Sequence, residues 1–259
     1  MKWSIGIDIG SVSTKGVLYN GQVWHSEVIS TGWSPSQAGK EVLERLLLTH
    51  GLTRDQIQIV VGTGYGRIQE GMFDKTFSEI TCHARGSSYL LPEACGFIDI
   101  GGQDSKVVAL AKTGKVRDFV LNDKCAAGTG RFLQVTAQTM GLEVSQLSDL
   151  AREANSVAIN SMCAVFAESE VIGLLAQGIS KSCIIAGLLQ SIAKRIGVMA
   201  GKLNFQGCII FCGGVAQNQV LKGLLSKEIG CKLFVPPKPQ SIGALGAAIL
   251  GYDLIKEEE

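Results

Sequence analysis

Residues 5–18 read IGIDIGSVSTKGVL and residues 97–110 read FIDIGGQDSKVVAL, so the chain contains one short phrase twice. In each copy an apolar run ends in Asp and Gly, and a hydroxyl-rich loop leads into a second apolar run. This pattern is typical of a β-hairpin with a tight glycine turn. The repeat predicts two duplicated halves that share a site. The offset is constant at 91 residues, and the matched residues are Asp8 with Asp99, Gly10 with Gly101, Thr14 with Ser105, and Lys15 with Lys106.

The two hairpin turns are candidate phosphate-binding loops. Glycine lets backbone N–H groups approach a ligand, and successive N–H groups form an anion-binding nest. Two such hairpins facing each other would bind the phosphates of a nucleotide, with Asp8 and Asp99 holding a hydrated Mg²⁺. Either copy alone would be an ordinary hairpin turn, and the repeat favours the shared site.

Composition narrows the class of protein. The 259 residues suit one large domain or two of about 100–130 residues, and 46% apolar residues support a sizeable core. A net charge of +1 gives no reason to expect nucleic acid or an anionic membrane as partner. The N-terminus has no signal-peptide pattern, and the uncharged stretch 205–221 is too short and too polar to span a bilayer. We therefore expect a cytoplasmic protein whose eight cysteines are buried, catalytic or metal-bound rather than disulfide-linked.

Hydrophobic periodicity predicts alternating strands and helices, which defines an α/β protein. Pro92 precedes the second phrase, and we place a domain boundary near 92–95. Strands are expected at about 3–9, 15–20, 23–30, 57–62, 96–100, 105–111, 116–121, 207–212 and 231–235. Helices are expected at about 36–49, 82–91, 129–140, 145–153, 164–177, 181–203, from GGVAQNQ to about 227, and at 241–252, followed by a solvated tail.

A third glycine site is CGGVAQN at 212–218, where Gly213 and Gly214 leave room for a flat ring or a ribose. The order of the three sites resembles the phosphate-1, phosphate-2 and adenosine motifs of the actin/Hsp70/sugar-kinase ATPase superfamily. SIGALGAAI at 241–249 resembles its terminal connecting helix. The resemblance implies two duplicated actin-like (ribonuclease H-like) lobes with a nucleotide cleft between them. Lobe I would be 1–93 with the C-terminal segment 238–259, and lobe II would be 94–237. No Walker-type P-loop pattern is present.

Two cysteines lie just ahead of predicted helices, Cys125 in NDKCAAGTGRFLQ and Cys163 in SMCAVFAESEV. Helix N-termini favour negative charge, as on a thiolate. The spacing fits no ferredoxin or zinc ribbon, so one chain offers half of a Cys₄ site, which a two-fold dimer would complete. The alternative is that both are buried small hydrophobes. Cys82–His83 lacks partners at ligand spacing and is interpreted as the start of a helix. Burial in apolar runs or at element ends is the interpretation for Cys95, Cys183, Cys208, Cys212 and Cys231.

The motifs GIDIGSVSTKG, TGYGR (63–67), IDIGGQDSK, NDKCAAGTGRFL, FAESEV and GGVAQN occur in this order. Together they resemble the ATP-dependent activators of 2-hydroxyacyl-CoA dehydratases, of the BadF/BadG/BcrA/BcrD ATPase family. The resemblance runs from residue 4 to about 251. It implies a homodimer that shares one [4Fe–4S] cluster, held by Cys125 and Cys163 in lobe II. Its implied nucleotide-binding residues are Ser11, Val12, Ser13, Thr14, Lys15, Gly101, Gly102, Gln103, Gly213, Gly214 and Gln240, and we expect the turn Gly128, Thr129, Gly130 with Arg131 to face the nucleotide.

The implied activity is ATP-driven electron transfer. A ferredoxin or flavodoxin would supply the electron, ATP would close the cleft, and loop 122–130 would link the nucleotide to the cluster. Asp8 and Asp99 would hold Mg²⁺, and either Gln103 or Asp104 would polarise the attacking water. The acceptor would be a 2-hydroxyacyl-CoA dehydratase, a benzoyl-CoA-type reductase or a double-cubane cluster protein. The alternatives are a sugar or carboxylate kinase, which needs no cysteine pair, and an actin-like filament protein.

Overall fold

The structure is a computed structural model that describes residues 2–68, 71–160 and 164–257. It divides into two compact units. Unit 1 consists of Met1–Phe97, Leu110–Arg117 and Pro236–Glu259, and unit 2 consists of Ile98–Ala109 and Asp118–Val235. Segment 110–117, which the sequence did not suggest as part of the first half, is held within unit 1 by the bond from the Ser88 hydroxyl to the Gly114 carbonyl (3.3 Å).

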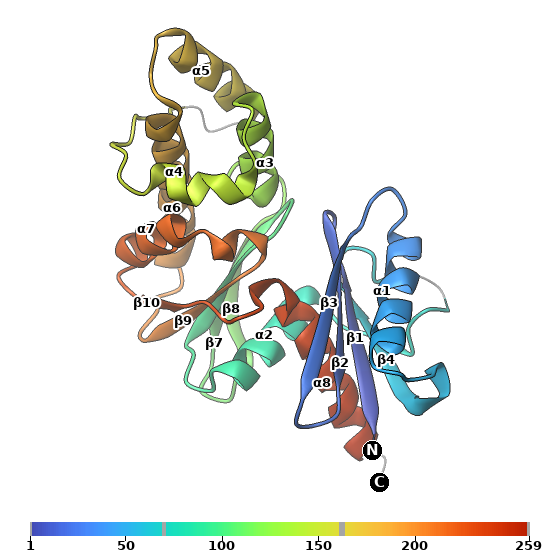
Figure 1. Cartoon of the computed structure of the whole chain (residues 1–259). Coiled ribbons are helices and arrows are strands. Elements are labelled where there is room, and N and C mark those ends of the chain that lie inside the picture. Colours follow the sequence, from blue (N-terminus) through green and yellow to red (C-terminus); the bar gives the residue numbers. More distant parts are fainter. Residues whose placement is uncertain (1, 69–70, 161–163, 258–259) are drawn as a thin grey trace. The chain divides into compact units, whose positions relative to one another are not determined.

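Unit 1 is built on a five-stranded sheet of order β3-β2-β1-β4-β5 (Figure 1). β1 and β2 form an antiparallel hairpin, and β3 extends it. β4 runs parallel to β1, and β5 runs parallel to β4. The strands are β1 (Trp3–Ile9), β2 (Ser13–Tyr19), β3 (Trp24–Ser30), β4 (Ile57–Thr63) and β5 (Lys75–Thr76).

Helices cover both faces of this sheet, namely α1 (Pro35–Thr49) on one face and α8 (Ile242–Glu257) on the other. Consecutive residues of β2 point to opposite faces. Leu18 packs in one core cluster with Leu46 of α1, whereas Val17 packs in another with Ala248 of α8. The helix α2 (Glu79–Leu90) packs against α8.

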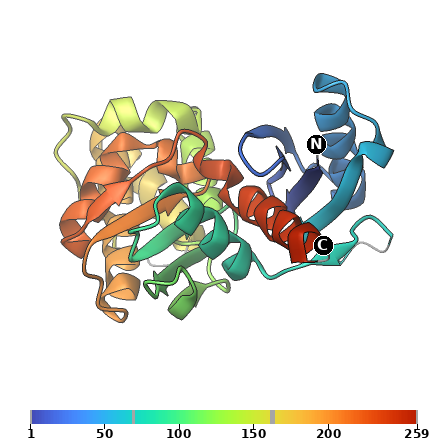
Figure 2. The same cartoon turned by 90° about the horizontal axis from the view of Figure 1, so that it is seen from below.

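The small residues of the last helix explain how it fits. A Cβ at Gly6 of β1 would overlap the carbonyl oxygen of Ala244, and a Cβ at Gly246 would overlap that of Cys82. Glycine at both positions therefore lets the α8 backbone approach both β1 and α2. Figure 2 shows α8, in red, beside the blue strands of unit 1.

The sheet of unit 2 has the order β10-β9-β6-β7-β8. In the opposite direction the first sheet is β5-β4-β1-β2-β3, so the first to fifth strands of each half occupy the same places in their sheets. β9 and β10 are parallel. The strands are β6 (Gly96–Ile100), β7 (Ser105–Leu110), β8 (Val116–Asn122), β9 (Cys208–Cys212) and β10 (Lys232–Phe234), and the outer ends of β6, β7 and β8 group with unit 1. The helices are α3 (Gly130–Thr139), α4 (Leu147–Ala151), α5 (Ala164–Ala176), α6 (Lys181–Gly201) and α7 (Gln219–Ile229).

Most elements lie within a few residues of their expected positions, and the differences have local causes. The helix expected from residue 82 begins at Glu79, because the Ser78 hydroxyl caps it by accepting the Thr81 N–H. Residues 144–146 form a 3₁₀ turn ahead of a short α4, where one helix was expected. The two-residue strand β5 was not expected, since it is too short for an alternating pattern. α8 continues to Glu257, so Lys256 is helical rather than part of a tail.

Among the described residues, α6 is the one helix whose length and composition would allow it to cross a membrane. However, 61% of its most apolar 18-residue window is buried within the protein. A helix packed in a protein core also meets these criteria of length and composition.

Candidate nucleotide and cysteine site

The first hairpin centres on Asp8, whose residue is only 5% exposed at the end of β1. Lys15 lies directly opposite on β2 and places its ammonium 3.5 Å from the carboxylate. The turn is closed by a hydrogen bond from the Gly10 N–H to the Ser13 carbonyl (3.1 Å). Val12 is exposed at the tip, so the backbone of this turn is accessible to a ligand.

Two glycines enclose the Asp8 carboxylate. Gly64 directly follows β4, has φ +87°, and a Cβ there would lie 2.5 Å from Asp8 Oδ1 and 2.5 Å from the Ile9 carbonyl oxygen. Gly243 is in the first turn of α8, and a Cβ there would lie 3.1 Å from Asp8 Oδ2. The positive end of the α8 dipole therefore stabilises this negative charge.

The second hairpin repeats the aspartate–lysine pair and adds a carboxylate. Asp99 and Lys106 are each 5% exposed, with 3.3 Å between the ammonium and Asp99 Oδ2. The same ammonium lies 2.5 Å from Asp104 Oδ2. Gln103 is exposed beside this network. A Gly101 N–H bond to the Asp104 carbonyl (3.0 Å) closes the turn as in the first hairpin.

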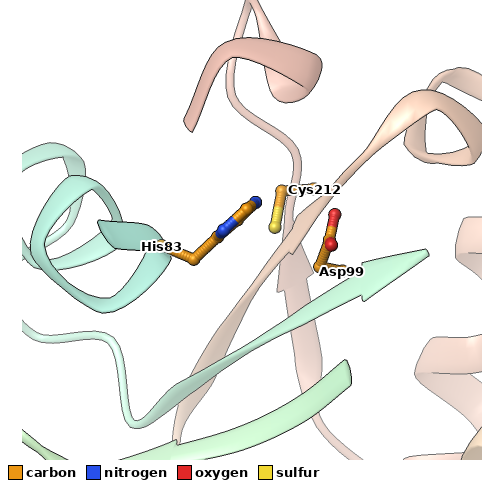
Figure 3. A group of neighbouring side chains, drawn as sticks. All are labelled: His83, Asp99 and Cys212. Atoms are coloured by element: carbon orange, nitrogen blue, oxygen red, sulfur yellow. The ribbon is translucent and has the colours of Figure 1, made fainter. Parts of the chain in front are cut away.

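Gly213 lies against the Asp99 carboxylate in the same way as Gly64 lies against that of Asp8. It directly follows β9, has φ +88°, and a Cβ there would lie 2.6 Å from Asp99 Oδ1 and overlap the Ile100 carbonyl oxygen. Asp99 and Cys212 (Figure 3) lie on the neighbouring strands β6 and β9. The Cys212 thiol donates to the Ile98 carbonyl (3.3 Å). Complete burial raises the pKa of Cys212 well above its usual range, and the negative charge of Asp99 adds to the rise.

Loop 122–130 is bonded to the second hairpin within unit 2. The Gly130 N–H donates to the Gly101 carbonyl and the Arg131 N–H donates to the Gly102 carbonyl, both at 2.8 Å. The Ser105 hydroxyl donates to the Gly128 carbonyl (2.6 Å). The structure thus brings together the two expected loops, Gly101–Gln103 and Gly128–Arg131. The Thr129 side chain is buried and its hydroxyl bonds to the Ala126 carbonyl inside the loop.

Cys125 lies in the same loop as a free, half-buried thiol. Asn122 shapes the loop, because its side-chain amide donates to the Cys125 carbonyl (3.0 Å) and to the Ala127 carbonyl (3.1 Å). A partly exposed thiol is accessible to a metal ion, whereas a thiol buried in the core is not. The position of Cys125 therefore fits a metal ligand better than a core residue. Cys163, the second expected ligand, falls outside the described residues.

The expectation that five cysteines are buried is correct for Cys212 and wrong for the other four. These four are half-buried, because they lie at the ends of elements rather than inside apolar runs: Cys95, Cys183, Cys208 and Cys231.

Cys82 is buried inside α2 rather than at its start, and burial raises its pKa to about 12. In the same helix, His83 (Figure 3) holds Nδ1 2.9 Å from the Glu79 carbonyl oxygen, and its ring stacks on Phe97 at 5.7 Å. Both residues are thus packed within unit 1.

The remaining expected residues take different positions. Ser11, Val12 and Ser13 form the first turn, whereas Thr14 is buried and its hydroxyl lies 3.0 Å from that of Thr31. Gly214 is exposed in unit 2, and Gln240 belongs to unit 1. Sequence reasoning matched Lys106 with Lys15 and quoted the TGYGR motif that contains Gly64, but it assigned no role to Lys106 or Gly64. The alignment of Lys106 with Lys15 in the repeat was a usable signal for the lysine.

Two sheets of one strand order, each carrying an Asp-Gly hairpin with a glycine against the aspartate, define an actin-like fold. A ROK family glucokinase from Streptomyces griseus, solved with glucose and AMPPNP, matches at a TM-score of 0.61 and 12% identity, covering 97% of this chain and 99% of that one, which concerns the fold alone. The chain belongs to the BadF/BadG/BcrA/BcrD ATPase family, whose model matches residues 5–251.

Close relatives support the same assignment. The chain is 44% identical to the 2-hydroxyisocaproyl-CoA dehydratase activator of Clostridioides difficile, over 99% of this chain and 97% of the relative. The structure of the activator of the 2-hydroxyisocaproyl-CoA dehydratase from Clostridium difficile with bound ADPNP matches at a TM-score of 0.94 and 43% identity, covering 99% of this chain and 96% of that one. Component A of the Acidaminococcus fermentans (R)-2-hydroxyglutaryl-CoA dehydratase matches at 0.95 and 37%, over 99% and 100%.

Proposed function

We propose that this protein is a cytoplasmic, ATP-hydrolysing electron donor that activates a 2-hydroxyacyl-CoA dehydratase. Similarity to two dehydratase activators along nearly the whole chain supports the partner class. The observation that carries the electron-transfer part is local. The loop bearing the half-buried Cys125 is hydrogen-bonded to the Asp-Gly hairpin expected to bind phosphate.

ATP with Mg²⁺ is the proposed nucleotide, and its binding is supported by the ADPNP in the related structure. Asp8 and Asp99 would hold the hydrated Mg²⁺, and Lys15 would neutralise phosphate charge. Gln103 would orient the attacking water. We prefer it to Asp104, because the Asp104 carboxylate is already paired with the Lys106 ammonium.

Cys125 fits a cluster ligand by exposure and by its place ahead of α3. With Cys163 it would provide two thiolates per chain, and a homodimer would supply the four that a [4Fe–4S] cluster takes. When bound, the cluster supplies a one-electron site, which a ferredoxin or flavodoxin would reduce. Asn122 would keep the Cys125 backbone in place through its bonds to the loop carbonyls.

The proposed coupling uses the bonds between hairpin and loop. A shift of Gly101 or Gly102 on nucleotide binding would act directly on Gly130 and Arg131, whose N–H groups donate to them. Nucleotide state would then alter the surroundings of Cys125. By linkage, occupancy at Cys125 would alter nucleotide affinity by the same factor.

The test uses protein purified without oxygen. We expect a brown dimer with about four irons, and Cys125→Ser should remove the iron while ATP still binds. ADP and a non-hydrolysable ATP analogue should give different EPR spectra or different rates of iron removal by a chelator. Cys208→Ser, at the start of β9, is the matched control and should keep its iron.

Other outcomes decide among the remaining functions. Iron-free protein that phosphorylates a sugar or carboxylate would make it a kinase, and ATP-dependent sedimentation would make it a filament protein. Identical spectra and chelation rates in all nucleotide states would remove the electron-donor proposal. Anaerobic capture of a benzoyl-CoA-type reductase or a double-cubane cluster protein in place of a dehydratase would change only the acceptor.

A further inference from the structure

Unit 2 contains a cavity of about 490 Å³ between strand β8, loop 122–130 and helices α3 and α6. It shares only Gly128 with the loops proposed to bind ATP. Its size lies within the range of small-molecule sites. Apolar side chains from three elements line it, namely Val120 of β8, Phe132 of α3, and Ile192 and Met199 of α6.

One stripe of α6 gives this cavity a positive charge. Residues 191, 195, 198 and 202 are spaced to lie on one helix face, and this face presents Arg195 and Lys202 to the cavity, with Lys194 beside them. Another side of α6 is occupied by α7, because Gln190 Nε2 donates to Glu228 (2.8 Å). Within residues 2–68, 71–160 and 164–257, none of the three cations forms an ion pair.

The cavity is connected to the Cys125 loop. Gly128 has φ +90°, and a Cβ there would lie 3.0 Å from Arg195 Cδ, so the arginine stem packs on the loop backbone. Asn122, which also lines the cavity, donates to the carbonyls of Cys125 and Ala127. A ligand that binds the Arg195 guanidinium would therefore fix a side chain that touches this loop.

We propose that this cavity binds an amphipathic organic anion, an apolar acyl or ring body carrying a phosphate or carboxylate, and that binding restrains loop 122–130. Apolar walls beside unpaired cations match both parts of such a ligand. The cavity overlaps the proposed nucleotide loops only at Gly128, and the inference does not depend on the electron-transfer proposal.

Binding is measured by calorimetry on the full chain saturated with Mg²⁺ and a non-hydrolysable ATP analogue, so that the nucleotide site is already filled. The probes are hexyl phosphate, hexanoate, hexanol and inorganic phosphate. We expect one of the two amphipathic anions to bind saturably, and hexanol and inorganic phosphate to bind at least about tenfold more weakly. The stronger of the two anions identifies the head group. The absence of saturable binding by both anions would overturn the proposal.

Variants locate the site. Arg195→Gln removes a charge-assisted bond, and Val198→Asp places a like charge beside the ligand on an exposed position. Each should weaken binding about tenfold. Lys227→Gln, on the exposed end of α7 and outside the cavity, should bind as the parent does. Equal affinity in all three variants would place the ligand elsewhere and overturn the assignment.

Hydrogen exchange tests the effect on the loop. The bound anion should slow amide exchange in residues 122–130 several-fold, with no change in α7. Binding without this protection would overturn the proposed restraint while keeping the site. Neither outcome bears on whether the parent protein hydrolyses ATP, so failure here and failure of the proposed function are distinguishable.

Discussion

The two Asp-Gly hairpins share a framework and differ in charge. Each pairs an aspartate with a lysine on the adjacent strand, and each places a glycine with φ near +88° against that aspartate. In the first hairpin Lys15 has one carboxylate partner, whereas in the second Lys106 is shared by Asp99 and Asp104. The residue that aligns with Asp104 is Ser13. The Lys106 charge of the second hairpin is therefore matched by two carboxylates, whereas Lys15 remains available to a phosphate.

The aligned hydroxyls continue the comparison. Thr14 contacts the hydroxyl of Thr31, just after β3, and Ser105 donates to Gly128, in the loop after β8. In both halves, then, a hydroxyl on the second strand of the hairpin contacts the segment that follows the third strand. Only in unit 2 does that segment contain a cysteine, Cys125.

The largest effect is expected at Lys106. Lys106→Met removes the cation that the buried Asp99 carboxylate and Asp104 share, which should lower the free energy of unfolding by about 3–5 kcal/mol. Lys15→Met should cost less, about 1–2 kcal/mol, because Lys15 is more exposed and the first turn of α8 still stabilises Asp8. Urea unfolding measures both. Equal losses would mean that the two networks are equivalent.

The next effect concerns hydrolysis. Asp8→Asn and Asp99→Asn should each reduce Mg²⁺-dependent ATP hydrolysis about 100-fold or more, since each removes a charge from the proposed metal site. Asp149→Asn, at an exposed ion pair on α4, should hydrolyse ATP at the parent rate. If both hairpin variants keep the parent rate, the hairpins serve only the fold.

The next effect in size is expected on stability, at the two glycines beside the aspartates. Gly64→Ala and Gly213→Ala each force a Cβ against a carboxylate and a carbonyl at positive φ, at an expected cost of about 2–3 kcal/mol. Gly51→Ala and Gly141→Ala are matched controls, because they also have positive φ but no heavy atom within 4 Å. They should lose about 1 kcal/mol or less. Thermal unfolding of all four separates backbone strain from overlap with the carboxylate.

Sequence reasoning predicted the hairpins and most strands because their signals are local. Two apolar runs joined by a short loop that begins with glycine are a local signal for a hairpin. The equivalence of Gly64 and Gly213 was not predictable from the repeat. They are 149 residues apart rather than 91, because helices α3 to α6 lie between β8 and β9, and their neighbours TGYG and CGGV share little.

Properties set by packing were also beyond the sequence. Asp104 was considered for polarising water, and only the packed structure shows its carboxylate beside the Lys106 ammonium. The cysteines at element ends looked buried because their neighbours are apolar. The exposure of a side chain depends on which side of its element faces the core, and Cys208, the first residue of β9, is only half-buried.

The smallest effect is expected at Ser105 and tests the link to the cysteine loop. Ser105→Ala removes the hydroxyl bond to the Gly128 carbonyl, which should lower the free energy of unfolding by only about 1 kcal/mol. The local effect should be larger than the global one, since this bond and the bonds to Gly130 and Arg131 are what tie the loop to the hairpin. Amide exchange in 122–130 should therefore rise several-fold, while exchange in β6 and β7 stays at the parent rate. Thr31→Val, which removes the corresponding hydroxyl in unit 1, is the matched control and should leave loop 122–130 unchanged. If the two variants loosen that loop equally, or if neither does, Ser105 does not connect the hairpin to Cys125.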